Sequence, residues 1–368
     1  MLSKADDFPI HQTPEPIAHA GSDRNFYDRY FFNGYSPDGD VFFAVAMGIY
    51  PNLNIIDASF CVVIDGVQHN LRASRHLNME RMDTRVGPIA VEIEAPLERL
   101  RVRVDSPAHG ISANILFHAR ALPVEEPRFI RRAGPRIVMD YTRLTQNGSY
   151  EGEIRISGRT IKLSRAVHLG TRDRSWGIRP VGAADSQPPA PAAAPQFFWL
   201  WAPCNFADRF SLYHLNADAF GSAWNTAGVV GALGKTEAVH MQACRSSLVL
   251  KKGTRHAQSA SIDLVTPGGG AINITMTPKW NFYMSGLGYL HPEWGHGHNK
   301  GPEAVGYDTH DLSKVDETQF PFLHVQAFSS VVLTDERGER HAGAGVLEQL
   351  ILGPYAPLNL SGILDGAP

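Results

Sequence analysis

The stretch WGHGHNKG, residues 294–301, gathers two histidines, a tryptophan, an asparagine and a lysine among three glycines. His296 and His298 are two residues apart, a spacing that places both side chains on one face of an extended chain. The glycines give the backbone the freedom to approach a ligand closely. We therefore expect His296 to act as a general acid or base beside the aromatic wall of Trp294, and we expect His298 to satisfy backbone carbonyls.

A metal site is the alternative interpretation of the same stretch. Zinc needs three or four ligands at defined spacing, and neither H-E-x-x-H nor paired C-x-x-C is present. The further ligands that a zinc ion could recruit are His291, Glu293, Asp308 and His310. We expect no metal ion and no other cofactor.

A second polar stretch, HLGTRDRSWGIRP at residues 168–180, places Asp173 between Arg172 and Arg174. A carboxylate flanked by arginines is held ionised by charge-assisted hydrogen bonds. Arg179 follows closely and enlarges the cluster. The alternative is a salt-bridged turn with Trp176 packed into the core. The sequence pattern is compatible with both a functional site and a structural turn.

Aromatic and polar residues recur in three other stretches. NFYDRYFFNGY (25–35) and QFFWLWAPC (196–204) are the most aromatic, and GVLEQL (345–350) contributes a late carboxylate. The candidate residues from these stretches and from WNFYMSGLGY (280–289) are Tyr27, Tyr30, Asn33, Trp199, Trp201, Tyr283 and Glu348.

Composition excludes several classes of function. The net charge of −3 and the pI of about 6.6 argue against nucleic acid as a partner. G-x-S-x-G, the P-loop and a strand-to-helix G-x-G-x-x-G are all absent. Nothing therefore indicates a nucleotide, flavin or pyridoxal site.

The cysteines and the N-terminus bear on location. Cys61, Cys204 and Cys244 are far apart and odd in number, so we expect no disulfide framework. The polar start MLSKADDFPIHQTPEP lacks the apolar region of a signal peptide. No run of eighteen apolar residues occurs, so no membrane span is expected. We expect a cytoplasmic protein, and a homo-oligomer is compatible with these observations.

The elements that must position these residues are strands. IAVEIEAP (89–96) and LRVRVD (100–105) alternate apolar and polar residues, and SFCVVIDGVQHNL (59–71) indicates two strands around an Asp-Gly turn. The length of 368 residues favours two domains. We predict an all-β protein with an N-terminal arm (1–24), a first β domain (25–190) and a second (196–368). The Ala/Pro-rich segment 182–195 is predicted to be a loop or linker.

These stretches resemble a known group of proteins. RDRSWGIR, GYLHPEWGHG and FYDRYFFNGY…GIYPN are similar to bacterial proteins related to carotenoid 1,2-hydratase (hydroxyneurosporene synthase) and to the lipocalin-like Diels–Alderases. The resemblance runs from about Asn25 to Tyr355, with D-x-S-W-G and W-G-H-G as its signatures. It implies two lipocalin-like (calycin) antiparallel β-barrel or sandwich domains packed together. It also implies acid–base chemistry on apolar molecules without a redox cofactor.

The candidate residues refine the expected substrate. Arginines near a pocket would be costly to bury against a plain isoprenoid, whereas aromatic side chains can stack on a ring while arginine steadies a phenolate or oxyanion. We therefore expect a lyase, hydratase or isomerase acting on a small hydrophobic, phenolic compound of plant or lignin origin. Retro-aldol loss of formaldehyde and addition or removal of water both suit these residues.

Each candidate has an expected role. Asp173 or His296 moves a proton, with Glu348 as an alternative carboxylate. Arg172 and Arg179 hold an anionic group, and Tyr27, Tyr30 or Tyr283 donates a hydrogen bond to a reacting oxygen. Asn33 contacts the substrate, and the walls are Trp176, Trp199, Trp201 and Trp294.

Three alternatives remain. One is an isoprenoid hydratase or cyclase. Another is a lipocalin-like carrier that binds an apolar ligand unchanged, which would have little use for charged residues in its pocket. In the third, the motifs are structural seams between two domains, and Arg172–Asp173 is an interdomain ion pair.

Overall fold

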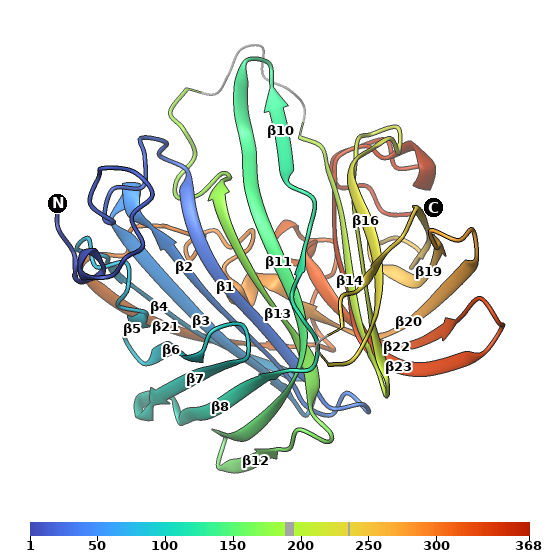
Figure 1. Cartoon of the computed structure of the whole chain (residues 1–368), viewed down its shortest axis with the longest axis horizontal. Coiled ribbons are helices and arrows are strands. Elements are labelled where there is room, and N and C mark those ends of the chain that lie inside the picture. The colour runs from blue at the N-terminus through green and yellow to red at the C-terminus, as the bar shows by residue number, and fades with distance from the viewer. Residues whose placement is uncertain (188–194, 235) are drawn as a thin grey trace.

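The computed structural model describes residues 1–187, 195–234 and 236–368 and shows an all-β protein. Two curled antiparallel sheets pack side by side (Figure 1), which confirms the predicted class of two lipocalin-like β domains. The helices in the described residues are short 3-10 turns: η1 (Lys4–Asp7), η2 (Pro51–Leu53), η3 (Pro107–His109), η4 (Met284–Leu287), η5 (Phe320–Phe322) and η6 (Ala356–Leu358). None of these helices is long and apolar enough to cross a membrane.

The first sheet runs in the order β21-β4-β3-β2-β1-β13-β11-β8-β7-β6-β5, with β9, β10 and β12 pairing to β11. Its strands are β1 (Phe26–Tyr35), β2 (Phe42–Tyr50), β3 (Ile55–Ile64), β4 (Val67–His76), β5 (Arg85–Val86), β6 (Ile89–Ala95), β7 (Arg99–Ser106), β8 (Ile111–Ala119), β9 (Val124–Glu125), β10 (Phe129–Ala133), β11 (Arg136–Ile156), β12 (Arg159–Leu163), β13 (Leu169–Ile178) and β21 (Glu303–Asp311). The predicted Asp65-Gly66 turn joins β3 to β4, with both residues at positive φ, as a tight hairpin requires.

The second sheet runs in the order β17-β16-β15-β14-β23-β22-β20-β19-β18. Its strands are β14 (Phe197–Phe206), β15 (Arg209–Ala217), β16 (Ala223–Ala232), β17 (Val239–His240), β18 (Ala243–Leu250), β19 (Ala257–Val265), β20 (Ala271–Tyr283), β22 (Val325–Thr334) and β23 (Arg340–Leu352). The two ends of this sheet approach each other, because the Met241 N–H donates to the carbonyl of Gly228 on β16 at 2.8 Å.

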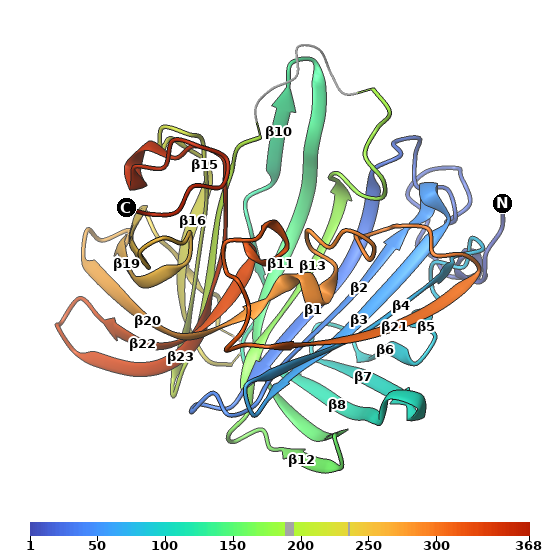
Figure 2. The same ribbon diagram turned by 180° about the vertical axis from the view of Figure 1, so that it is seen from behind.

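One strand connects the two halves. β21 lies far along the chain, within the predicted second domain, yet it pairs with β4 at the edge of the first sheet (Figure 2). The loop 284–302 that leads to β21 therefore lies at the junction of the sheets. The domain boundaries stay a prediction, and residues 188–194 of the predicted 182–195 linker lie outside the described residues.

Among the described residues, apolar side chains form three large cores and a small cluster of Tyr27, Tyr50, Ile55 and Val181. One core lies inside each curled sheet, and a third lies between the sheets. In this third core, Phe31 of β1 meets Trp201 of β14 at a ring-centroid distance of 6.1 Å, and Tyr35 meets Phe328 of β22 at 5.4 Å. This aromatic contact holds the two sheets together beside a pocket that is described below.

Candidate functional site

A pocket of about 530 Å³ lies between the two sheets. Strand β11 and the segment after β13 form one wall, and β14, β23 and the loop 288–298 form the other. The lining residues are Met139, Tyr141, Arg143, Arg179, Pro180, Val181, Gly182, Phe197, Trp199, Gly288, Tyr289, Leu290, His291, Gly295, His296, His298, His324, Glu348, Leu350 and Leu352.

The strand register of the first sheet explains the wall on its side. Alternate residues of β1, β13 and β11 face the second sheet because side chains alternate along a strand. Tyr27 and Tyr141 lie in one row across the sheet, with Gly177 between them. Arg29 and Arg143 form the next row, across Ser175. Asp173 belongs to the row after that, toward the aromatic core between the sheets.

A hydrogen-bonded network forms the wall on the other side. Glu348 on β23 is buried, and its Oε1 accepts from the indole of Trp199 and from Nε2 of His324, both at 2.9 Å. Its Oε2 accepts from Nε2 of Gln326 at 2.7 Å. Burial acts to raise the pKa of Glu348, but the hydrogen bonds, led by the one from His324, lower it below its usual value. Glu348 is therefore a carboxylate.

His324 is oriented by this carboxylate. Its Nε2 faces Glu348, so Nδ1 is the free acceptor in the neutral ring, and Nδ1 is buried without a hydrogen-bond partner in the described part of the chain. The imidazole also packs edge-on against Tyr289, with a centroid distance of 4.5 Å. A histidine held in one tautomer by a carboxylate is arranged to accept a proton.

Asp173 has a different environment. It is half-buried, and within the described residues its carboxyl group makes no hydrogen bond. Burial raises the pKa of Asp173 to about 6, while Arg143 opposes the increase and Glu126 and Glu348 add to it. Asp173 thus shares its electrostatic surroundings with Arg143 and Glu348, both of which line the pocket. The pKa of Asp173 is therefore raised, whereas that of Glu348 is lowered.

Three arginines bring positive charge to this region. Arg143 donates from Nε to Glu126 at 2.9 Å and lies over the ring of Trp199 at 4.8 Å. Arg179 lies 4.4 Å from the ring centroid of Tyr27, and Arg29 lies 4.8 Å from that of Tyr289. Each arginine keeps at least one buried N–H group without a partner among the described residues.

The loop that carries His296 is fixed at several points. His296 contacts the Leu287 carbonyl through Nε2 at 3.0 Å, and its Nδ1 accepts from Arg179 at 3.3 Å. The N–H of Gly297, which adopts a positive φ of 73°, donates to half-buried Asp57 at 2.7 Å. Burial and the nearby guanidinium of Arg29 keep the pKa of His296 well below its usual value. His296 is therefore a neutral ring with both nitrogens engaged, which suits positioning better than proton transfer.

The structure brings eight of the sequence-predicted residues to this junction. Arg179, Trp199, His296 and Glu348 line the pocket. Asn33 lies behind it and donates to Gln326 at 3.0 Å. The remaining three, from the facing rows and the adjoining core, are Tyr27, Asp173 and Trp201.

Three predicted residues lie on the opposite face of the first sheet. Arg172 and Trp176 flank Asp173 and Ser175 in sequence, so strand alternation turns them away from the second sheet. Arg172 and Tyr30 are buried on the inner side of the first curled sheet, and Trp176 is 39% exposed. The structure therefore separates Arg172 and Arg174 from Asp173, and it contains no Arg172–Asp173 ion pair within 4.0 Å.

Two further predicted residues are elsewhere. Tyr283 at the end of β20 faces Glu317 at 3.5 Å, in a separate pocket of about 320 Å³. Trp294 packs over Gly306 of β21, with Lys300 at 4.9 Å from its ring centroid. Trp294 thus anchors the loop to the first sheet rather than forming a pocket wall.

Sequence analysis missed several pocket residues. Tyr289 lies within GYLHPEWGHG, a motif that was singled out for its histidines, and Arg29 lies in the aromatic stretch 25–35. Both residues thus lie in stretches that the sequence marks as candidates, although neither was itself predicted as a site residue. Arg143 on β11 and Gln326 on β22 occur in ordinary strand sequence, and His324 directly precedes β22. Strand pairing brings these residues to the junction.

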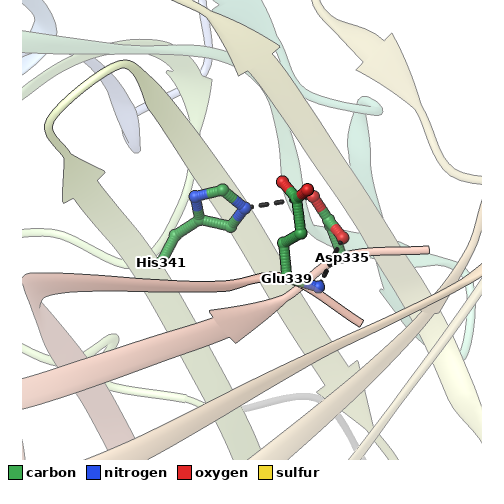
Figure 3. A group of neighbouring side chains, drawn as sticks. All are labelled: Asp335, Glu339 and His341. Atoms are coloured by element: carbon green, nitrogen blue, oxygen red, sulfur yellow. Dashed lines mark hydrogen bonds and ion pairs between the residues drawn. The ribbon is translucent and has the colours of Figure 1, made fainter. Parts of the chain in front are cut away.

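Among the described residues, one group has ligand atoms close enough together to hold a metal ion: Asp335, Glu339 and His341 at the β22–β23 turn (Figure 3). Asp335 accepts from the backbone N–H groups of Arg337 and Glu339 and faces His341 Nε2 at 3.0 Å. These bonds, led by His341, lower the pKa of Asp335. These hydrogen bonds are typical of a turn in which neighbouring polar groups bond to one another, and they account for this cluster without a metal ion. His296 and His298 do not belong to this group.

Three solved structures share this fold. An AttH candidate from Nitrosomonas europaea has a TM-score of 0.51 at 13% identity, over 90% of this chain and 94% of its own. Kievitone hydratase from Nectria haematococca has a TM-score of 0.51 at 10% identity, over 95% and 96%. CghA, solved with Sch210972, has a TM-score of 0.52 at 10% identity, over 89% of each chain. The predicted resemblance is thus supported at the level of the fold.

Among curated proteins, none matches this sequence. A family model matches residues 2–361, nearly the whole chain. The chain belongs to that family, which is described as a family of unknown function (DUF8625).

Proposed function

We propose that the pocket between the sheets is the active site of a cofactor-independent enzyme that uses acid–base catalysis. One observation carries this proposal. Two carboxyl groups from facing sheets, Glu348 in the lining of the pocket and Asp173 on β13 beside it, interact electrostatically but have pKa values shifted in opposite directions. Titratable pairs whose environments separate their pKa values are a common basis for distinct acid and base roles.

The proposed proton donor is Asp173. A carboxyl group with a pKa of about 6 is partly protonated near neutral pH, and its proton-transfer reactivity is then well matched to that pH. The proposed acceptor is Nδ1 of His324. Glu348 receives the Nε2–H of this ring and would stabilise the imidazolium that forms when Nδ1 takes a proton.

The proposed substrate is a small hydrophobic aromatic compound, with a phenolic ring as the favoured class. Trp199, Tyr141 and Phe197 supply aromatic wall surface, and Leu350 and Leu352 add aliphatic surface. A pocket of about 530 Å³ is within the size range of small-molecule sites. Arginine N–H groups would stabilise an oxyanion that develops on the substrate.

Addition or removal of water is the first reaction to examine, because kievitone hydratase is named for such a reaction and shares the fold. In removal, Asp173 would protonate the leaving hydroxyl as the carbon–oxygen bond breaks. His324 would then take a proton from the neighbouring carbon as the double bond forms. In the alternative retro-aldol step, His324 takes the hydroxymethyl proton and the carbon–carbon bond breaks. Asp173 then protonates the carbanion, and formaldehyde leaves.

Mass spectrometry of reaction products tests this proposal. The chelator-treated protein is incubated with hydroxylated phenolic dimers and with isoprenoids, without added cofactor. We expect a phenolic product that differs from its substrate by water or formaldehyde, and we expect Asp173→Asn to abolish its formation. Tight binding of compounds that are recovered unchanged would instead favour a carrier. Conversion of isoprenoids alone would overturn the substrate class.

A further inference from the structure

Buried arginines in this chain are mostly paired with a carboxylate. Arg72 and Arg255 are 2% exposed and contact Asp308 and Asp365, each at 2.6 Å. Such pairing is the norm, because an isolated buried charge is costly. Arg143 of the pocket follows the rule through Glu126.

Arg29 and Arg179 depart from this pattern at the junction, as Arg172 does on the opposite face of the first sheet. In the described residues, no carboxylate oxygen lies within 4.0 Å of the guanidinium of Arg29 or Arg179. Arg29 is 2% exposed, and its Nε and Nη1 have no partner. Nε of Arg179 also lacks a partner, as does Nη2 of Arg143. The residue Arg143 is 8% exposed and lines the pocket. Donors are therefore in excess at this junction.

Aromatic rings hold the two guanidinium groups in place. Arg179 lies 4.4 Å from the ring centroid of Tyr27 and 5.8 Å from that of Tyr289, while Arg29 lies 4.8 Å from Tyr289. Cation–π contact orients a guanidinium without neutralising its charge. The charge therefore remains available to a ligand, and Nη2 of Arg179 is fixed by its bond to His296.

The nearby carboxyl groups do not offset this excess. Burial raises the pKa of Asp57 and of Asp173, so both favour the neutral form more than an ordinary carboxyl group does. Glu126 and Glu348 are committed to Arg143 and His324. Neither of these two carboxylates pairs with Arg29 or Arg179.

Part of the pocket lining is apolar. Phe197 pairs with Leu352 in register, and Met139 lies two residues beyond Tyr141 on the facing β11. Glu348 pairs with Trp201, four residues further along β14. The pocket lining thus combines an apolar surface, at Phe197, Leu352 and Met139, with the guanidinium groups of Arg143 and Arg179.

We infer that this pocket binds an amphipathic organic acid, with its carboxylate at Arg179 and Arg143, which line the pocket, and its aromatic body against Phe197 and Leu352. This inference rests on the proposed function, since it specifies the substrate class of the same pocket. A planar carboxylate matches the paired donors of a guanidinium, and Nε of Arg179 and Nη2 of Arg143 are without a partner among the described residues.

Calorimetry with two isosteric probes tests the inference. The probes are 4-hydroxycinnamate and its neutral amide, 4-hydroxycinnamamide. We expect the native protein to bind the acid about ten- to a hundredfold more tightly, because hydrogen bonds to charged groups are stronger than neutral ones. Arg179→Gln should remove this preference, and Arg179→Lys should restore part of it.

Arg172→Gln is the matched control, since Arg172 is buried on the opposite face of the same sheet. It should leave the preference for the acid intact. Equal affinity of the native protein for both probes, or an equal loss of preference in Arg172→Gln and Arg179→Gln, would overturn the inference. Circular dichroism verifies that each variant is folded.

The same probes distinguish this inference from the proposed function. Preferential binding of the acid, in a protein that converts none of the compounds in the product screen, would support the anion site and refute the enzyme. Conversion of neutral phenolic compounds, without any preference for the acid, would support the enzyme and refute the anion site.

Discussion

The two faces of β13 differ in how their charges are satisfied. On the inner face of the first sheet, Arg174 pairs with Asp28 and lies 3.7 Å from the ring centroid of Tyr30, and Arg172 donates to Gln146 at 2.8 Å. On the face toward the second sheet, Asp173 makes no hydrogen bond within the described residues, although Arg143 and Arg29 both act on it electrostatically. Nη2 of Arg172 also has no partner among the described residues, but the unpartnered guanidinium N–H groups are more numerous toward the second sheet, at Arg29, Arg143 and Arg179.

This difference separates structural polar groups from candidate functional ones. A protein gains stability when buried polar groups are satisfied internally. Unsatisfied donors and a raised carboxyl pKa on one face are a cost that a ligand can offset, as is common at functional sites. The contrast predicts that substitutions on the two faces have opposite consequences for activity and stability.

The largest expected effect is that of Asp173→Asn. If Asp173 transfers the proton, kcat falls by about 10²- to 10⁴-fold in the product assay. Thermal stability at pH 7 should not fall, because the substitution removes a carboxyl group whose burial is unfavourable when charged. A marked loss of stability without a kinetic defect would instead support the seam interpretation, with Asp173 as an interdomain ion-pair partner.

Glu348→Gln should have the next largest effect. Gln326 donates its Nε2–H to Glu348 Oε2, so an amide nitrogen at that position would face another donor. We expect a loss of stability of about 1–3 kcal/mol and a lower kcat, because His324 loses its charged partner. Denaturant unfolding and product assays measure the two effects separately. Wild-type values of both would remove Glu348 from the mechanism.

The pH dependence follows from the raised pKa of Asp173. As a proton donor with a pKa of about 6, Asp173 makes kcat/KM decline above pH 6 by about tenfold per pH unit. The stability of the folded protein also decreases as pH rises through this range. The unfolded carboxyl group ionises near pH 4, so the folded protein loses on the order of 2 kcal/mol as pH rises from 4 to 6.

Asp173→Asn provides the control for both pH effects, because it should remove this part of the stability profile. Activity that rises through pH 6 would assign Asp173 the role of a base. A flat profile between pH 5 and 7 would exclude it from proton transfer.

The fold followed from the sequence because its signals are local. The alternation of residues 89–105 and the Asp65-Gly66 turn each specify a strand or hairpin from neighbouring residues alone. The position of β21 was not predictable in this way. Residues 303–311 pair with β4, more than two hundred positions earlier, and short-range periodicity does not encode that partner.

The site was predictable only in part, for a related reason. Sequence proximity suggested one Arg172–Asp173–Arg174 cluster, but the same two-residue period that identifies a strand also divides those residues between two faces. The partners of Asp173 come from β1 and β11 by register. His324 carries no sequence signal, since its role depends on Glu348 across a strand pair.

Arg172→Met should have the smallest effect, and it provides the sharpest test of the contrast between faces. Burial and the neighbouring Arg174 lower the pKa of Arg172 to about 10, which marks its charge as unfavourably placed. Methionine fills similar space without that charge, so stability should change by less than about 1 kcal/mol and could increase. Because Arg172 faces away from the pocket, turnover should change by less than about twofold. If Arg172→Met impaired turnover as severely as Asp173→Asn, the reacting groups would span both faces of β13, and the active site would extend into the first curled sheet.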